Sequence, residues 1–363
     1  MKKLPPKVEN AYKRLLPYLT ALFFTSGFFF DVVTLGRIDN ILNILSHGAY
    51  LLAVIFILRN QIVGAAAPPH AHRGILLFFE YQNELLHFLL GALLNAFVIF
   101  YFKSGSVANT FVLLMILAVL LIANELQIFK KQGPALKVAL IVISLVSYFI
   151  YLVPVTLGKT GTGIFALSVF CACVVLAGFW YYLFRKQIDR RKIYKNLVIP
   201  AGCVLLGFVL LYALKIIPPI PLSLKHLGIY HAMEVSGDQY ILYRQTPNWR
   251  FWSKGDQEFV ARPGDRIYLF AKIFSPGGFK GKVFLHFQYH LRNGEWKTSD
   301  RIPMNIVGGR ADGFRGHAYK QNYDQGEWRA KVETENGLEI GRISFTVTLS
   351  DEKEERKFYT ELH

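Results

Sequence analysis

Seven apolar stretches fill residues 15–217, and each is long enough to cross a lipid bilayer as a helix. We expect these helices at residues 15–34, 40–58, 80–102, 107–128, 135–155, 162–184 and 197–217. Helices of soluble proteins carry a polar face, so a series of runs this apolar is typical of membrane spans. The sequence therefore predicts an integral membrane protein with an all-α bundle of seven transmembrane helices over residues 1–217. Its first partner is the lipid bilayer.

The basic residues that flank these stretches orient the chain. Sixteen of them fall on one side: Lys2, Lys3, Lys7, Lys13, Arg14, Arg59, Arg73, Lys130, Lys131, Lys137, Arg185, Lys186, Arg190, Arg191, Lys192 and Lys195. The opposite side holds only Arg37, Lys103 and Lys159. Lysine and arginine collect on the cytoplasmic side of membrane spans. We therefore expect the amino terminus in the cytoplasm and the C-terminal region on the other side of the membrane.

A net charge of +16 raises the question of nucleic-acid binding. Nineteen of the 41 basic residues are the membrane flanks just named, and no basic soluble domain is predicted on the cytoplasmic side. We therefore expect no nucleic-acid partner. The three cysteines, Cys171, Cys173 and Cys203, lie in apolar stretches and form no metal-binding CxxC pair.

The pattern changes after Ile217, where three prolines begin a linker over residues 218–227. Alternation of apolar and polar residues then predicts strands at 239–244, 266–274, 282–291, 296–300, 313–320, 327–334 and 340–349. Asn293-Gly294 and Asn336-Gly337 are strong hairpin signals between such runs. We expect an extracytoplasmic all-β immunoglobulin-like sandwich over residues 228–350. The charged tail at 351–363 is expected to be solvated or briefly helical.

This region also carries recognisable motifs. They are the stretch HFQYHL from His286, the Gly-Phe-Arg step at Gly313–Arg315 and the closing hairpin Gly326–Phe345. With these motifs, residues 255–350 resemble an uncharacterised bacterial family, the domain of unknown function 2914, whose members often follow a multi-helix membrane region. The resemblance implies a bacterial inner membrane with the C-terminal domain in the periplasm. It implies no catalytic residue.

Aromatic and basic residues mark a possible binding surface on the periplasmic domain. Aromatic rings stack on sugars and apolar ligands, and arginine grips carboxylates or phosphates with two parallel hydrogen bonds. The candidate residues are Trp249, Arg250, Trp252, Arg310, Arg315 and Tyr319. The alternative is structural: Trp296 and Trp328 fill the sandwich core, and Trp249 and Trp252 rest at the membrane surface.

Polar residues recur inside the first four predicted helices, where they are costly in contact with lipid. Spacings of three and four residues place Glu80, Glu84 and His87 on one helical face. The predicted topology sorts the polar residues into two clusters. The inner cluster is Glu80, Glu84, His87, Asn124 and Glu125, and the outer cluster is Asp31, Asn40, Asn43, His47 and Asn95. We expect these faces to turn toward one another and away from lipid.

Three roles are open for this polar seam. Its residues fix helix packing by hydrogen bonds, or they carry protons or a solute, since a carboxylate and a histidine in low dielectric exchange protons near neutrality. In the third role, Glu84 and His87 bind a metal, because a Glu-x-x-His step puts two ligands on one face. No other cofactor is predicted.

No arrangement typical of hydrolytic chemistry appears in the sequence, so we expect a protein that is not an enzyme. The first expectation is that the periplasmic sandwich binds an envelope component, such as an envelope polymer, or a periplasmic protein partner, while the bundle anchors it. The alternatives are a proton-coupled small-solute transporter that uses the polar seam and a membrane-embedded metal or redox enzyme.

Overall fold

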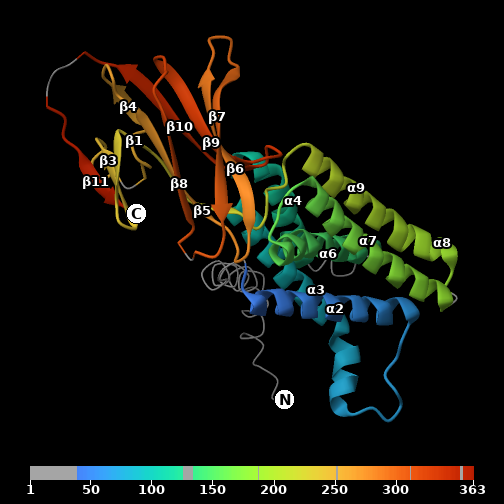
Figure 1. The fold of residues 1–363 in the computed structure, drawn as a ribbon. Helices are drawn as coiled ribbons and strands as arrows, with labels where there is room; N and C mark the ends of the chain where they lie inside the picture. Colours follow the sequence, from blue (N-terminus) through green and yellow to red (C-terminus); the bar gives the residue numbers. More distant parts are fainter. Residues whose placement is uncertain (1–38, 126–133, 187, 251, 311, 352–354) are drawn as a thin grey trace, which may run out of the picture.

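A computed structural model describes residues 39–125, 134–186, 188–250, 252–310, 312–351 and 355–363. A helical N-terminal part is followed by a C-terminal β domain (Figure 1). The helices are α2 (Ile41–Val63), α3 (Arg73–Ser104), α4 (Val107–Glu125), α6 (Pro134–Leu157), α7 (Thr162–Arg185), α8 (Arg190–Ile193), the π-helix η1 (Tyr194–Val198) and α9 (Ile199–Ala213). The helix predicted at 15–34, with Asp31, lies outside the described residues.

The described helices are apolar enough to be membrane spans. Five segments meet the length and composition of a span: α2, α3, α6, α7 and the continuous helix Arg190–Ala213 formed by α8, η1 and α9. Ala108–Leu120 of α4 is a shorter apolar helix. The most apolar windows of α3 and α6 are 72% and 67% buried, against 11% and 17% in α7 and Arg190–Ala213. α3 and α6 are therefore the central helices of the bundle.

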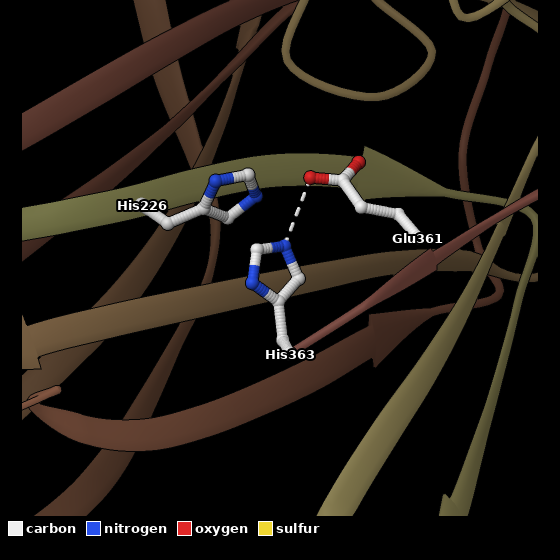
Figure 2. Close-up of side chains that lie close together, drawn as sticks. All are labelled: His226, Glu361 and His363. Carbon is white, nitrogen blue, oxygen red and sulfur yellow. Dashed lines mark hydrogen bonds and ion pairs between the residues drawn. The ribbon is translucent and has the colours of Figure 1, made fainter.

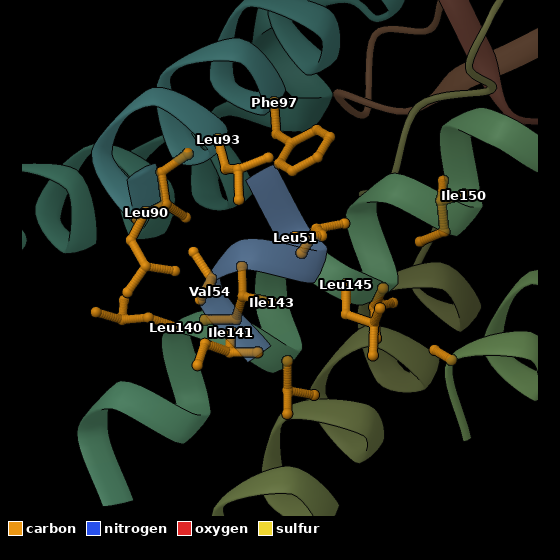
Figure 3. Packing of buried hydrophobic residues seen from close by; sticks show 14 of the residues in the cluster. Leu51, Val54, Leu90, Leu93, Phe97, Leu140, Ile141, Ile143, Leu145 and Ile150 are labelled. Atoms are coloured by element: carbon orange, nitrogen blue, oxygen red, sulfur yellow. The ribbon is translucent and has the colours of Figure 1, made fainter. Parts of the chain in front are cut away.

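The bundle core forms where α2, α3 and α6 meet. Leu51 and Val54 of α2 lie beside Leu93 of α3 and Ile141 of α6 (Figure 3). On each helix the buried residues recur every three or four positions, as at Leu51 and Val54 of α2 and at Leu93 and Phe97 of α3, which places them on one stripe. Burying such a stripe contributes about 25 cal/mol for each Å² of apolar surface removed from water, and in lipid the same contacts act through close packing.

Several helix boundaries differ from the sequence prediction: α2 continues to Val63 rather than ending at residue 58, the last helix ends at Ala213 rather than at 217, and two helices begin earlier than predicted. α3 begins at Arg73 rather than at residue 80, and its backbone is non-helical at Tyr81 (φ −106°, ψ 15°), so its first turns form a separate segment that projects from the bundle (Figure 1). The last helix begins at Arg190 rather than at 197, because Asp189 caps it with a side-chain oxygen that accepts from the backbone N–H of Arg191 at 2.9 Å. Both spans are therefore extended at their N-terminal ends, α3 by a mostly apolar segment and the last helix by a basic one.

The described residues of the β domain form three sheets. Sheet A has the order β1 (Ser223–Tyr230), β5 (Ile267–Phe274), β8 (Phe314–Lys320). Sheet C has the order β4 (Glu258–Ala261), β10 (Glu339–Leu349), β9 (Gly326–Thr334), β6 (Lys280–His290), β7 (Trp296–Val307). Sheet B has the order β11 (Tyr359–Leu362), β3 (Gln239–Arg244), β2 (Ala232–Ser236). All neighbouring strands are antiparallel except β4 and β10.

Sheet A is the middle layer of the domain. Leu269 and Ala271 of β5 pack with Phe287 and Val332 of sheet C in the main core, and Phe270 packs with Leu242 of sheet B in a second core. Successive side chains of a strand point to opposite faces, so one strand serves both cores. This explains why six of the eight β5 residues are buried and the strand reads as nearly continuous hydrophobic sequence.

Some strand predictions were accurate and others were missed. The strand at 239–244 has the predicted bounds, while the strand predicted at 296–300 continues to Val307. β1 begins at Ser223, inside the predicted linker 218–227. The prediction of a solvated or briefly helical tail is wrong for residues 359–362, which form β11 and pair with β3. A single edge strand among polar residues has little alternation to reveal it.

The β domain sits directly on one end of the helical bundle (Figure 1). Gly158, after α6, accepts a hydrogen bond on its carbonyl from the backbone N–H of Lys280 at 3.2 Å. A side chain at residue 158 would meet the carbonyl of Gly278 at 2.7 Å, and its φ of 62° favours glycine as well. Farther along, Asn336 donates through Nδ2 to Thr162 Oγ1 at 3.1 Å.

A polar cluster of Asn109, Arg342 and Glu339, which we call the latch, also joins the β domain to the bundle. Asn109 of α4 donates through Nδ2 to Glu339 Oε2 at 3.0 Å, and Arg342 donates to Asn109 Oδ1. Arg342 also donates to both carboxylate oxygens of Glu339, at 2.5 and 2.8 Å. The Glu339 carboxylate is almost fully buried, so it depends on these donors for its stability.

Removing either partner of the latch is expected to have unequal effects. Asn109→Ala removes two hydrogen bonds to charged partners, Glu339 and Arg342, but leaves the ion pair between them in place, so it should lower the free energy of unfolding of the β domain by about 1.5 kcal/mol. Arg342→Ala leaves the buried Glu339 short of its main partner and should lower it by about 3 kcal/mol. Denaturant unfolding of the full chain in detergent, followed by tryptophan fluorescence, measures both, with Arg292→Ala in an exposed turn as control. Equal losses for the two variants would contradict the latch.

Candidate functional site at the junction of helices and β domain

The chain makes an unusual turn where α9 ends. Lys215 has a φ of 59° and closes the helix in the left-handed conformation that glycine usually supplies. Its N–H bonds to the carbonyl of Tyr212, and the N–H of Ile216 bonds to that of Leu211, both at 2.9 Å. Such a conformation costs a non-glycine residue about 1–3 kcal/mol. This turn directs the Lys215 side chain toward Gly337 in the β9–β10 hairpin. A Cβ atom added at Gly337 would lie only 2.7 Å from Lys215 Nζ.

A polar cleft of about 680 Å³ opens between the bundle and the outer face of sheet C. The lining side chains include Asn109, Lys215, His286, Arg301, Lys331, Glu333 and Glu339. Most of these charges are paired within the cleft wall: Arg301 lies 2.8 Å from Glu333, and Lys331 lies 3.6 Å from Glu339. In the part of the chain that the structure describes, Lys215 forms no ion pair. Glu335, which also lines the cleft, forms none either, so among the described cleft residues Lys215 is the unpaired cation and Glu335 the unpaired carboxylate.

An apolar groove of about 650 Å³ adjoins this cleft. It runs between α7 and α9, which both pack on α6, and its walls include Phe165, Val169, Phe170, Val209 and Tyr212. Phe165 and Tyr212 stack with their ring centroids 3.8 Å apart. The groove ends at Lys215, Asn336 and Leu338, and the first two of these residues also line the polar cleft. The two cavities therefore meet at Lys215.

The predicted polar residues of the outer helical cluster have mixed positions. His47 and Asn95 are buried, and the His47 ring lies against Phe97 and Phe100 of α3, with centroids 6.0 and 5.8 Å apart. Asn43 is half-buried. Asn40 is exposed, and its side chain caps α2 by accepting from the N–H of Leu42 at 3.0 Å. His47 is thus held mainly by aromatic packing.

The predicted residues of the inner cluster differ in burial. His87 is buried, whereas Glu80 and Glu84 are exposed on the same helix. The side chains of Asn124 and Glu125 are outside the described part. Lys137 lies at this end of the bundle and donates to Asn83 Oδ1 at 2.6 Å and to Gln61 Oε1 at 3.0 Å. From the sequence it was expected only to flank a membrane span. The polar contacts here therefore join α2, α3 and α6.

The predicted tryptophan surface lies on the β3–β4 loop. Trp249 and Trp252 are 64% and 60% exposed and meet edge to face with centroids 5.7 Å apart, and the Arg250 guanidinium lies over Trp249. Asp256, almost fully buried, anchors this loop by accepting from the N–H groups of Gln245 and Thr246 and from the Thr246 hydroxyl. The structure thus fixes the base of a loop whose aromatic rings face outward.

The other predicted surface residues lie on or next to β8. Arg310 and Arg315 each approach the carboxylate of Asp238 to 3.7 Å, and Arg315 also donates to the Asp238 carbonyl. Tyr319 lies under the Arg266 guanidinium and beside Tyr268. Trp328 is buried in the domain core, whereas Trp296 is only half-buried and stacks on His290 and under Arg329. The core role predicted for tryptophan is therefore correct for Trp328 and wrong for Trp296.

A group of metal-ligating residues appears elsewhere in the β domain. His226, Glu361 and His363 offer ligand atoms that all lie within 4.8 Å of one another (Figure 2). Among the described residues this is the one group of three or more such side chains, so none forms around Glu84 and His87. Burial is the main cause that lowers the pKa of His226 to about 4, and the hydrogen bond from His363 is the main cause that lowers the pKa of Glu361 to about 2.

The comparison with protein families gives a match in this β domain. Residues 281–347 match the family described as "Protein of unknown function (DUF2914)", which confirms the resemblance seen in the sequence. No curated protein matches the chain. Among solved structures, the DNA-bound alkylpurine DNA glycosylase AlkC of Pseudomonas fluorescens shows 13% identity over 86% of this chain and all of that one. Its TM-score of 0.22 supports no statement about fold or function.

The base of the tryptophan loop predicts a pH dependence. His231 stacks on Phe259, and its Nε2 lies 3.5 Å from Asp256 Oδ2. Burial lowers the pKa of His231 below its usual 6.5, opposed by Asp256 and Asp265 and reinforced by Arg356. The unfolded chain therefore takes up the proton first, and stability should fall as the pH drops below about 6.5.

The melting temperature of the full chain, measured from pH 7.5 to 5, should decline less in His231→Gln than in wild type. His290→Gln, at a more exposed histidine, is the control, and a His231→Gln profile parallel to wild type would contradict this assignment.

Proposed function

We propose that this chain is a bacterial inner-membrane protein whose seven-helix bundle and periplasmic β domain together bind an amphiphilic envelope molecule. The ligand has an anionic head group, held at Lys215 in the polar cleft, and an apolar tail, held in the groove between α7 and α9. The observation that carries the proposal is the meeting of the two cavities at Lys215.

The membrane placement rests on exposed apolar surface and on charge. Phe88, Phe170 and Leu206 are each about 60–70% exposed on their helices, which favours a lipid environment over water. The basic residues around α8 lie at the end of the bundle opposite the β domain (Figure 1), as the positive-inside rule requires of a periplasmic β domain. We also assign the β domain to the immunoglobulin-like class, since sheets A and C enclose one core.

The charges favour an anionic head group over a cationic one. The cleft carboxylates Glu333 and Glu339 already face Arg301, Lys331 and Arg342, so they have little attraction left for a cation. Glu335, the third cleft carboxylate, lines only the polar cleft, whereas Lys215 lies where the cleft meets the groove, so the head group of a tail bound in the groove meets the ammonium first. Lys215 instead offers three N–H donors and a full charge. Charge-assisted hydrogen bonds of this kind contribute about 1.5–3 kcal/mol each. The paired side chains around it offer further donors and acceptors to a polar head group.

Binding to defined lipids tests this proposal. Native mass spectrometry of the full chain with phosphatidylglycerol should show a retained lipid, and Lys215→Gln should weaken it at least about tenfold. Lys297→Gln, at an exposed lysine of β7 outside both cavities, should have no effect. Ala166→Phe, which fills the groove without touching the cleft, should also weaken binding. Equal retention by wild type and Lys215→Gln would overturn the proposal. Lipids extracted from the native membrane then distinguish a bulk phospholipid from a lipid-linked envelope precursor.

The exposed tryptophans favour a second candidate function, the binding of an envelope polymer. Two aromatic faces beside an arginine suit a sugar ring with nearby acidic groups. Peptidoglycan fragments titrated into the full chain should give a calorimetric binding signal with wild type, a readout that does not depend on the tryptophans themselves. The double variant Trp249→Ala/Trp252→Ala should weaken binding by about thirtyfold, at about 1 kcal/mol for each ring. Trp296→Phe is the control, and unchanged affinity of the double variant would remove this surface as a glycan site.

The proton-coupled transporter has less support. Its proposed carboxylates Glu80 and Glu84 are exposed while His87 is buried, so the face predicted to line a shared path is divided between two environments.

A further inference from the structure

The three residues of the histidine–glutamate group come from opposite ends of the β domain sequence. His226 lies on β1 in sheet A, and Glu361 and His363 lie on or just after β11 in sheet B (Figure 2). Glu361 and His363 are two residues apart, so their side chains share one face of the strand. The strand ladder continues past β11, because Tyr240 and His363 exchange both backbone hydrogen bonds at 2.9 and 3.0 Å. Both residues are therefore held by main-chain pairing.

The shared face of Glu361 and His363 points at sheet A. The His363 ring stacks on Phe270 of β5 with centroids 5.2 Å apart and lies 4.3 Å from the ring of His226. On β1, the pairing with β5 shifts register between Leu224 and His226. Such bulges re-aim side chains, and here the shift precedes the histidine that faces β11.

Hydrogen bonds order the three ligands before any ion binds. His363 Nε2 lies 2.9 Å from Glu361 Oε1, and the Tyr230 hydroxyl donates to Glu361 Oε2 at 3.1 Å. The same hydroxyl lies 2.8 Å from His226 Nε2. Tyr230 is fully buried, so its hydroxyl holds the side chains of His226 and Glu361 in fixed positions relative to each other. Metal sites use such outer contacts to hold their ligands in place.

We propose that His226, Glu361 and His363 bind one divalent transition-metal ion, with Zn²⁺ as the preferred ion, and that this ion fastens β11 to β1. Two imidazole nitrogens and one carboxylate oxygen form a donor set that zinc accepts, at bond lengths of about 2.0–2.2 Å. Ligand atoms around such an ion lie roughly 3.2–3.5 Å apart, so the 4.8 Å spread in the structure needs only side-chain rotation. The fourth position is left to water.

The charge around the group limits the ion that it can hold. Glu361 supplies one negative charge, while Arg244 lies 3.7 Å from its Oε2 and Lys254 and Lys272 are close enough to influence His226. These cations weaken binding of hard ions such as Ca²⁺ and Mg²⁺, which depend on several carboxylates. Nitrogen-rich coordination depends less on net charge and favours the later transition metals.

The test uses the full chain without an affinity tag, purified in detergent and stripped with a chelator. Zn²⁺ titrated by calorimetry in competition with a chromophoric chelator should bind at one ion per chain, and Co²⁺ should give the visible absorption of a nitrogen-ligated site. His226→Gln should weaken Zn²⁺ binding at least about a hundredfold, the loss of one of three ligands. Zn²⁺ should also raise the melting temperature of wild type.

Two comparisons keep the result unambiguous. His290→Gln removes a histidine that pairs with Glu327 at 3.0 Å outside the group, and it should bind Zn²⁺ like wild type. Glu361→Gln keeps the size of the side chain and should also lose binding. Its melting temperature in chelator shows whether the strand stays folded. If Zn²⁺ binds equally to wild type, His226→Gln and Glu361→Gln, or does not bind to wild type, the proposal is wrong.

Discussion

The structure depends on the direct seating of the β domain on the end of the helical bundle. The connection from α9 to β1 is short, and backbone contacts at Gly158, the Asn336–Thr162 hydrogen bond and the Asn109–Arg342–Glu339 latch hold the two parts together. Because the β9–β10 hairpin stands over the ends of α7 and α9, an apolar groove opens against a polar wall. Neither part alone has both surfaces.

The same principle of shared layers organises the β domain. Sheet A is covered on both faces, so β5 contributes to two cores at once. The outer layer, sheet B, is completed by β11 from the chain's C-terminal segment. This closure brings Glu361 and His363 to His226, 135 residues away from Glu361 in sequence. In the region that the family match covers, residues 281–347, none of these three ligands is present.

Periodicity and composition predicted the elements well, but not the sites. The apolar helices, the β domain and several strand bounds were visible because burial imposes periods of 3.6 and two residues. The seam residues His47, His87 and Asn95 were correctly expected to be buried, whereas Glu84 shares their helical spacing and is exposed. Spacing places residues on a face but does not say what covers that face.

The residues that carry the two proposed sites lie where the sequence predicted no site. Lys215 lies at the end of the last predicted helix, His226 in the predicted linker, and Glu361 and His363 in the predicted tail. Each acquires its role through a partner far along the chain, so no local pattern reveals it. The proline cluster at 218–221 did signal a fixed connection, and a connection that short could have indicated that the domain rests on the bundle.

Photo-crosslinking with a lipid tests the central claim most directly. The full chain in nanodiscs containing phosphatidylglycerol with a photoreactive tail is irradiated, digested and analysed by mass spectrometry. Our account predicts adducts on the facing surfaces of α7 and α9, at residues 165–173 and 209–213, that are lost in Lys215→Gln. Adducts spread evenly over the exposed faces of all helices, and unchanged in Lys215→Gln, would contradict a specific amphiphile site at the junction.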